Sequence, residues 1–141
     1  MNEDRILKLL EDFREWENDF SQCVNAIKQC ESEDMRKLLY HSARAYFLDF
    51  HILCEDYISI NLKELRKFKI DISAIGGMEI IKESGVVSKE ILEFYSSSRR
   101  LRNRLAHRYK VPDDGVLVKN LEQNMELIKE LSGNLKKMLS Y

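Results

Sequence analysis

The sequence contains few residues that interrupt helices, with one proline and five glycines among 141 residues. A fold of many strands needs more turn residues, so this scarcity argues against such a fold and permits long helices. Hydrophobic residues make up 44% and charged residues 33% of the chain, which is typical of a folded domain and not of a disordered one. The length suits one domain, residues 1–141, and we expect it to bury about two-thirds of its unfolded surface.

Cysteines and long apolar runs are also scarce. Cys23, Cys30 and Cys54 are odd in number and lack the C-x2-C spacing of a zinc site. We therefore expect reduced thiols in a cytoplasmic protein, without a metal or another cofactor. The N-terminal MNEDRILKLLEDF is acidic and amphipathic, unlike a signal peptide, and no apolar run has membrane-spanning length.

Hydrophobic residues recur every three or four positions through most of the chain, which is the helical period. This pattern predicts four long helices and one short helix, over about residues 4–30, 34–68, 74–82, 89–109 and 116–139. Ser32, Ser73 and Ser88 stand where N-caps are expected. Short connections favour antiparallel neighbours, so the predicted fold is all-α, an up-and-down helical bundle.

The second predicted helix carries two further predictions. Its hydrophobic stripe includes Leu48 and Ile52, and its length allows a kink near Ser59–Asn61. His41 and His51 lie ten residues apart, which is not a metal-binding spacing on a helix. We expect both histidines at the surface or at the edge of the bundle.

Two features that suggest ligands have structural explanations. Trp16 is the only tryptophan, and a position in the core or at an interface is favoured over stacking on a ligand. Gly76–Gly77 interrupts the short helix without the G-x-x-x-x-G-K-S/T pattern of a phosphate loop. We expect this pair to form a bend that lets two helices pack closely.

The most unusual segment is 99–110, RRLRNRLAHRYK, which holds six Lys/Arg, one His and no acid. The remainder of the chain has a net charge of −7, so an anionic molecule carries one dense cationic block. Pro112 disfavours helical geometry at Val111, which puts this block at the C-terminal end of a helix. Basic residues are also favourable there because of the helix dipole, so a solvated helix end is the structural alternative.

The string R-N-R-L-A-H-R-Y at 102–109 resembles the R-x4–6-H signature of HEPN domains. It is most similar to the R-N-x-x-x-H-x-Y form found in HepT toxins. The resemblance implies a HEPN-like helical bundle and a metal-independent endoribonuclease toxin that works as a homodimer. It also implies neutralisation by a minimal nucleotidyltransferase antitoxin, which adenylylates the tyrosine at position 109.

The motif suits RNA cleavage by the adjacent 2′-hydroxyl, which needs a base, an acid and fixed positive charge on the phosphate. His107 is the candidate base or acid, and Arg102 is able to hold phosphate oxygens bidentately. On a continuous helix the two side chains would lie about 140° apart, so we expect the chain to leave helical geometry near His107. Asn103 is placed to orient His107, and Tyr109 to line the same cleft. The other cations are expected to contact RNA phosphates: Arg99, Arg100, Arg104, Arg108 and Lys110.

Two other functions stay open. A non-catalytic helical subunit that binds nucleotide or substrate for a nucleotidyltransferase would show nucleotide binding without nuclease activity. The His-x-Tyr end of the motif disfavours this function, since a phosphate clamp needs arginines but no titrating group. A structural interaction protein with a fortuitous motif would point the basic block into solvent.

Overall fold

The computed structural model describes residues 2–107 and 111–139. In this part of the chain every regular element is a helix, in the order α1 (Glu3–Gln29), α2 (Glu33–Glu64), α3 (Ala74–Glu83), α4 (Lys89–Arg104), α5 (Asp114–Glu122) and α6 (Met125–Leu139). The all-α prediction is confirmed.

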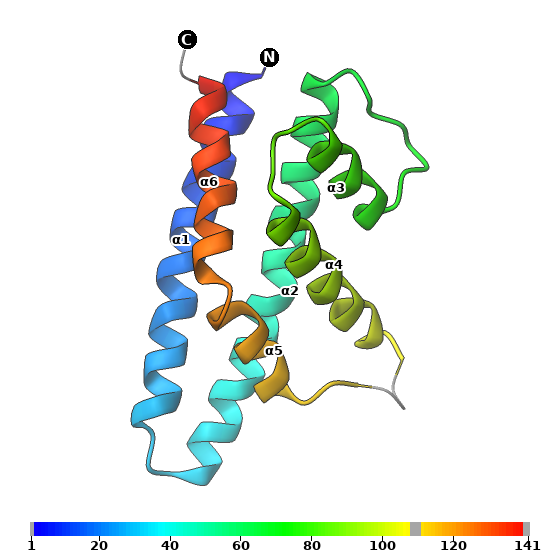
Figure 1. Cartoon of the computed structure of the whole chain (residues 1–141). Helices are drawn as coiled ribbons and strands as arrows, with labels where there is room; N and C mark the ends of the chain where they lie inside the picture. Colours follow the sequence, from blue (N-terminus) through cyan, green and yellow to red (C-terminus); the bar gives the residue numbers. More distant parts are fainter. Residues whose placement is uncertain (1, 108–110, 140–141) are drawn as a thin grey trace.

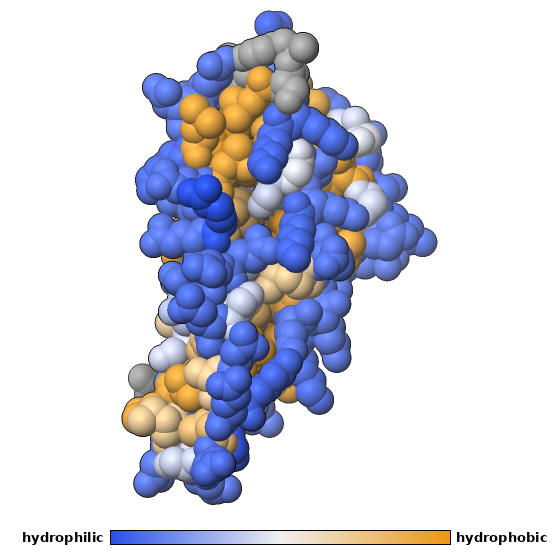
Figure 2. Space-filling model, turned by 90° about the vertical axis from the view of Figure 1, so that its left-hand side faces the viewer, coloured by the Kyte–Doolittle hydropathy of each residue, from blue (hydrophilic) through white to orange (hydrophobic). Residues whose placement is uncertain are grey.

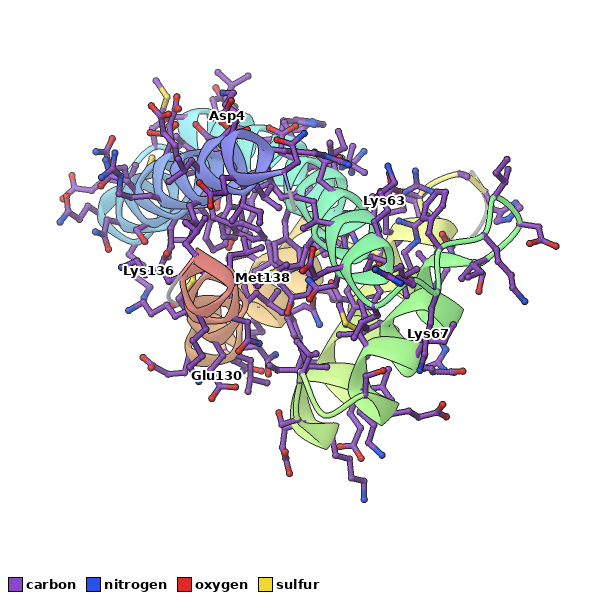
Figure 3. All side chains as sticks on the ribbon, turned by 90° about the horizontal axis from the view of Figure 1, so that it is seen from above. Asp4, Lys63, Lys67, Glu130, Lys136 and Met138 are labelled. Carbon is purple, nitrogen blue, oxygen red and sulfur yellow. The ribbon has the colours of Figure 1, made fainter. Side chains whose placement is uncertain are left out.

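Helix α2 is the centre of the bundle (Figure 1). The long helix α1 packs along one side of it and α6 lies beside α1, whereas α3 and α4 pack on the other side of α2. Helix α1 begins and α6 ends at the same end of the bundle. Seen along the bundle in Figure 3, Met138 of α6 points toward the middle, while Lys136 and Glu130 point outward.

Buried apolar side chains from all six helices form one hydrophobic cluster. Its largest fully buried members are Tyr57, Tyr95, Phe13, Phe20, Phe47 and Phe50. By contrast, the face shown in Figure 2 is mostly hydrophilic, with separate hydrophobic areas toward its two ends. Burial of the apolar side chains of the cluster, away from water, is the main stabilisation of such a bundle.

The three predicted serine caps are confirmed. The side chains of Ser32, Ser73 and Ser88 each accept a hydrogen bond from the backbone N–H three residues later, at 3.0–3.2 Å. Each cap satisfies one of the amides that a helix start leaves without an intrahelical partner. These serines therefore fix where α2, α3 and α4 begin.

Helix α2 differs from its prediction in two respects. It runs through Ser59–Asn61 without a break and ends at Glu64, before the predicted end near residue 68. Leu48 and Ile52 are 37% and 57% exposed, so the predicted stripe follows the wrong face there. The buried face instead carries Ala43, Phe47, Phe50, His51 and Cys54.

The last predicted helix is two helices, α5 and α6, separated at Gln123 and Asn124. The Asn124 backbone N–H bonds to the carbonyl of Leu121, three residues back, and its side-chain amide donates to the carbonyl of Asn120 at 2.7 Å. Asparagine competes for backbone groups in this way, which disfavours a regular helix interior. The apolar spacing continues across this break, so the pattern alone did not reveal it.

Helices α2 and α3 end in the same manner. Arg66 follows α2 with a φ of 59°, and Gly85 follows α3 with a φ of 81°. In both, the next residue donates its N–H to a carbonyl five positions earlier. Lys67 donates to the carbonyl of Leu62, and Val86 donates to the carbonyl of Ile81. This is the Schellman ending, for which glycine is the usual residue because it has no Cβ. Arg66 adopts the left-handed conformation without that advantage.

Gly77 lies where α3 crosses α2. A Cβ at this position would lie 2.6 Å from Cγ2 of Ile58 and 3.3 Å from Cδ1 of Leu62. The prediction of close helix packing is confirmed for Gly77, whereas a Cβ at Gly76 would meet Ser73 and Ile72, before α3. The pair does not interrupt α3, which is continuous from Ala74 to Glu83.

Trp16 belongs to the core, as predicted. It is 5% exposed, its ring stacks on Phe20 with centroids 5.2 Å apart, and its Nε1–H donates to the carbonyl of Tyr46 at 2.8 Å. The hydrogen bond satisfies the one polar group of the indole, which a buried tryptophan requires.

The cysteines are free thiols, with Cys23 and Cys54 buried and Cys30 half-buried. None of the helices in the described ranges combines the length and the apolar character needed to cross a membrane.

Candidate functional site at the end of helix α4

Helix α4 presents four arginines on its last two turns. Its buried face carries Ile91, Phe94, Tyr95, Ser96 and Ser98. This face holds the helix against the core, so Arg100 and Arg104 are exposed, while Arg99 and Arg102 are half-buried at the edges.

Arg99 and Arg102 differ in how their charges are compensated. Nη1 of Arg99 forms an ion pair with Oε1 of Glu55 on α2 at 2.7 Å, and its side chain is only 15% exposed. Nη1 of Arg102 donates to the amide oxygen of Asn103 at 3.5 Å, a long hydrogen bond. Over residues 2–107 and 111–139, no carboxylate forms an ion pair with Arg102. Its charge is therefore available to an anion.

The backbone tightens after α4. The N–H groups of Leu105, Ala106 and His107 bond to carbonyls three residues back, at 3.0–3.2 Å, in place of the four-residue spacing of an α-helix. The chain therefore leaves α-helical geometry before His107, as predicted. The change comes earlier than expected, because α4 ends at Arg104 and not near residue 109.

The structure places the predicted site residues as follows. Arg102 and Asn103 are brought together, and His107 is exposed just beyond the helix end. The hydrogen bond that places the Asn103 side chain is with Arg102, so its predicted role in orienting His107 stays a prediction. Arg108, Tyr109 and Lys110 lie outside the described residues.

A buried histidine lies beneath the arginines. His51 of α2 is 1% exposed, its Nε2 is 2.8 Å from Oγ of Ser98, and its ring is packed against Phe47 and Tyr95. The prediction of a surface position is therefore wrong for His51, whereas His41 is exposed. The spacing of Phe47, Phe50 and His51 is also helical, and this alternative stripe was the signal in the sequence.

His51 is neutral in the folded protein. Burial lowers its pKa to about 3, and the positive charges of Arg99 and Arg102 act in the same direction. Its Nδ1 has no hydrogen-bond partner in the part of the chain that the structure describes. A neutral ring adds no further positive charge beneath Arg99 and Arg102.

Metal binding has no candidate residues in the described ranges, where no group of three or more His, Cys, Asp or Glu is placed to hold an ion. The chemistry available at the end of α4 is therefore that of guanidinium groups and one exposed imidazole. These groups bind anions and transfer protons.

Fold and site together define an all-helical domain with a half-buried arginine and an exposed histidine at one helix end. A family model described as ribonuclease HepT-like matches residues 4–135. The chain belongs to this HepT-like ribonuclease family, which confirms the predicted family and extends the similarity to the N-terminal helices. No curated protein and no solved structure matches the chain.

Proposed function

We propose that this protein is a metal-independent endoribonuclease that acts as a toxin. Two identical subunits form a cleft, and each contributes Arg102 and His107 to one RNA phosphodiester. The family membership supports the ribonuclease class, and the motif supports the residues.

In the proposed reaction, one His107 takes the proton of a ribose 2′-hydroxyl, and that oxygen attacks the adjacent phosphorus. The bond from phosphorus to the 5′-oxygen breaks, and the leaving oxygen takes a proton from the second His107. The products are a 2′,3′-cyclic phosphate and a 5′-hydroxyl. Arg102 binds the non-bridging oxygens and stabilises the charge that develops on them.

The observation that carries this proposal is the difference between two neighbouring arginines. Arg99 is neutralised by Glu55, whereas no carboxylate within residues 2–107 and 111–139 pairs with Arg102, which makes a long hydrogen bond to the Asn103 amide. Arginine is almost never fully buried without a charged partner, and Arg102 is half-buried with no described carboxylate as its partner. An arginine without one, five residues before an exposed histidine, suits a bound phosphate.

We also propose a cognate nucleotidyltransferase antitoxin that transfers AMP to the Tyr109 hydroxyl with release of pyrophosphate from ATP. The resemblance of the motif supports this modification. AMP on Tyr109 would bring bulk and negative charge next to Arg102 and His107, and would therefore block RNA. Mass spectrometry of the protein co-expressed with the product of its adjacent gene tests the modification, and unmodified Tyr109 would contradict it.

The nuclease activity is tested with His107→Ala and Arg102→Ala. We expect each to lower the cleavage rate by at least about 100-fold, the lower range for loss of acid–base catalysis. His41→Ala, at an exposed histidine, is the matched control and should keep the wild-type rate. EDTA should not change the rate, and the new ends should be cyclic phosphates.

Cleavage that survives both substitutions, or that stops in EDTA, would contradict the proposal. Nucleotide binding at the basic block without any cleavage would indicate the non-catalytic partner subunit instead.

A further inference from the structure

A pocket of about 380 Å³ lies next to the arginine block, between α2, the 65–73 connector and α4. Ile58 and Leu62 of α2 give it an apolar lining, while Glu55, Ser59 and Arg99 supply polar groups. In Figure 1 the connector leaves the end of α2, extends away from the bundle and turns back to the start of α3. The volume lies in the range of small-molecule sites, about 300–1,000 Å³.

The connector adds an aromatic ring to this pocket. Phe68 lines it and is 45% exposed, and Nζ of Lys63 lies 4.9 Å from the centroid of its ring. Ile70, also in the lining, is 97% exposed. An exposed aromatic ring flanked by cations is the usual platform on which single-stranded RNA stacks a base.

The position of the pocket relates it to the proposed reaction. Arg99 lines the pocket and precedes Arg102 on α4 by three residues, about 4.5 Å along the axis. An RNA strand whose phosphate is bound by Arg102 therefore passes close to the pocket opening.

We propose that this pocket binds a base of the RNA, next to the phosphate held by Arg102, an inference that rests on the proposed function. The base stacks on Phe68, and its polar edge bonds to Glu55 and Ser59. The Glu55 side chain remains 46% exposed although it is paired with Arg99. A carboxylate only accepts hydrogen bonds, and the one donor on the pairing edge of uracil, N3–H, stands between two carbonyl oxygens that repel a carboxylate. The pocket therefore favours bases with an exocyclic amino group over uracil.

The first experiment needs binding but no cleavage. The His107→Ala protein is mixed with a single-stranded RNA of random sequence, irradiated with ultraviolet light and analysed by mass spectrometry. We expect an RNA adduct on Phe68. Adducts confined to other segments would overturn the pocket as a base site.

The second experiment measures base preference. The ends produced by the wild-type protein are sequenced, and uracil should be about tenfold less frequent than the other bases at one position beside the cut. Ser59→Leu, which fills the pocket, and Phe68→Ala, which removes an exposed ring, should both abolish this preference. Ser21→Leu, at an exposed serine of α1, is the matched control and should retain it. An unchanged preference in both pocket variants would overturn the inference.

The two experiments separate this inference from the proposed function. A Phe68 adduct on His107→Ala, together with no cleavage by the wild-type protein, supports the pocket as a base site and contradicts the nuclease activity. Cleavage with adducts elsewhere supports the nuclease and contradicts the pocket. If Ser59→Leu instead weakens binding of the nucleotidyltransferase and leaves RNA adducts unchanged, the pocket is a protein-docking site and the inference is wrong.

Discussion

The buried imidazole of His51 makes the stability of this protein depend on pH in a defined direction. The ordinary pKa of a histidine, 6.5, applies to the unfolded chain, and burial lowers the pKa of His51 to about 3 in the folded protein. Between these two values the unfolded chain binds a proton that the folded protein does not bind. The contribution of His51 to the free energy of unfolding should therefore be fully present above pH 6.5. It should decrease as the pH falls toward 3.

The size of this effect follows from the shift of the pKa. Each pKa unit corresponds to about 1.4 kcal/mol, so the contribution of His51 amounts to about 5 kcal/mol once the pH has fallen to the lower pKa. Between pH 7 and pH 5 the loss should be about 2 kcal/mol. This interval is the informative one, because most carboxylates have not yet begun to bind protons there.

The assay is urea denaturation followed by circular dichroism at several pH values between 7 and 5. His51→Gln retains a polar group near Ser98 and removes the titrating ring, so its free energy of unfolding should lose about 2 kcal/mol less over this interval than that of the wild type. Each protein is compared with its own value at pH 7, which removes the packing cost of the substitution. His41→Gln replaces an exposed histidine and should keep the wild-type pH dependence.

An equal loss of stability in the wild type and in His51→Gln would refute the reasoning. It would mean that His51 binds its proton as readily in the folded protein as in the unfolded chain.

Two pairs of substitutions test the backbone features. Gly77→Ala should lower the free energy of unfolding by about 1 kcal/mol, because the clash with Ile58 exceeds the gain in helix propensity. Gly133→Ala places no atom within 4 Å of the new Cβ, so it should raise the free energy of unfolding by a similar amount. A gain in both variants would contradict the close approach of α3 to α2. Arg66→Gly should raise it by about 1 kcal/mol and Gly85→Ala should lower it by about 1 kcal/mol, since both positions have positive φ. Thermal and urea denaturation measure all four, and a loss in Arg66→Gly would contradict the left-handed conformation of Arg66.

The sequence predicted helices well where the apolar spacing had one interpretation. Helix α1 buries one clean stripe, and the serine caps marked the starts of three other helices within one residue. Helix α2 has apolar residues on several faces, so Leu48 and Ile52 competed with Phe47 and Phe50 for the core. The packing of the other helices against α2 decides between these faces.

The motif made Arg102 and His107 candidates from local sequence, and the partners of the arginines did not follow from it. Glu55 is 44 residues from Arg99, and Ser98 is 47 residues from His51, so both contacts exist only after α2 and α4 have packed. The pocket beside Arg99 likewise depends on the path of the connector. These are tertiary contacts, which helical periodicity does not encode.

The burial of the only tryptophan gives this protein a convenient optical probe. The Trp16 indole lies between α1 and α2, and the ring of Phe50 stands between it and Phe94 of α4. Its fluorescence should shift to longer wavelength when α1 separates from α2, and should remain constant when a ligand occupies the end of α4. The same sample then distinguishes a variant that unfolds from one that has only lost its ligand.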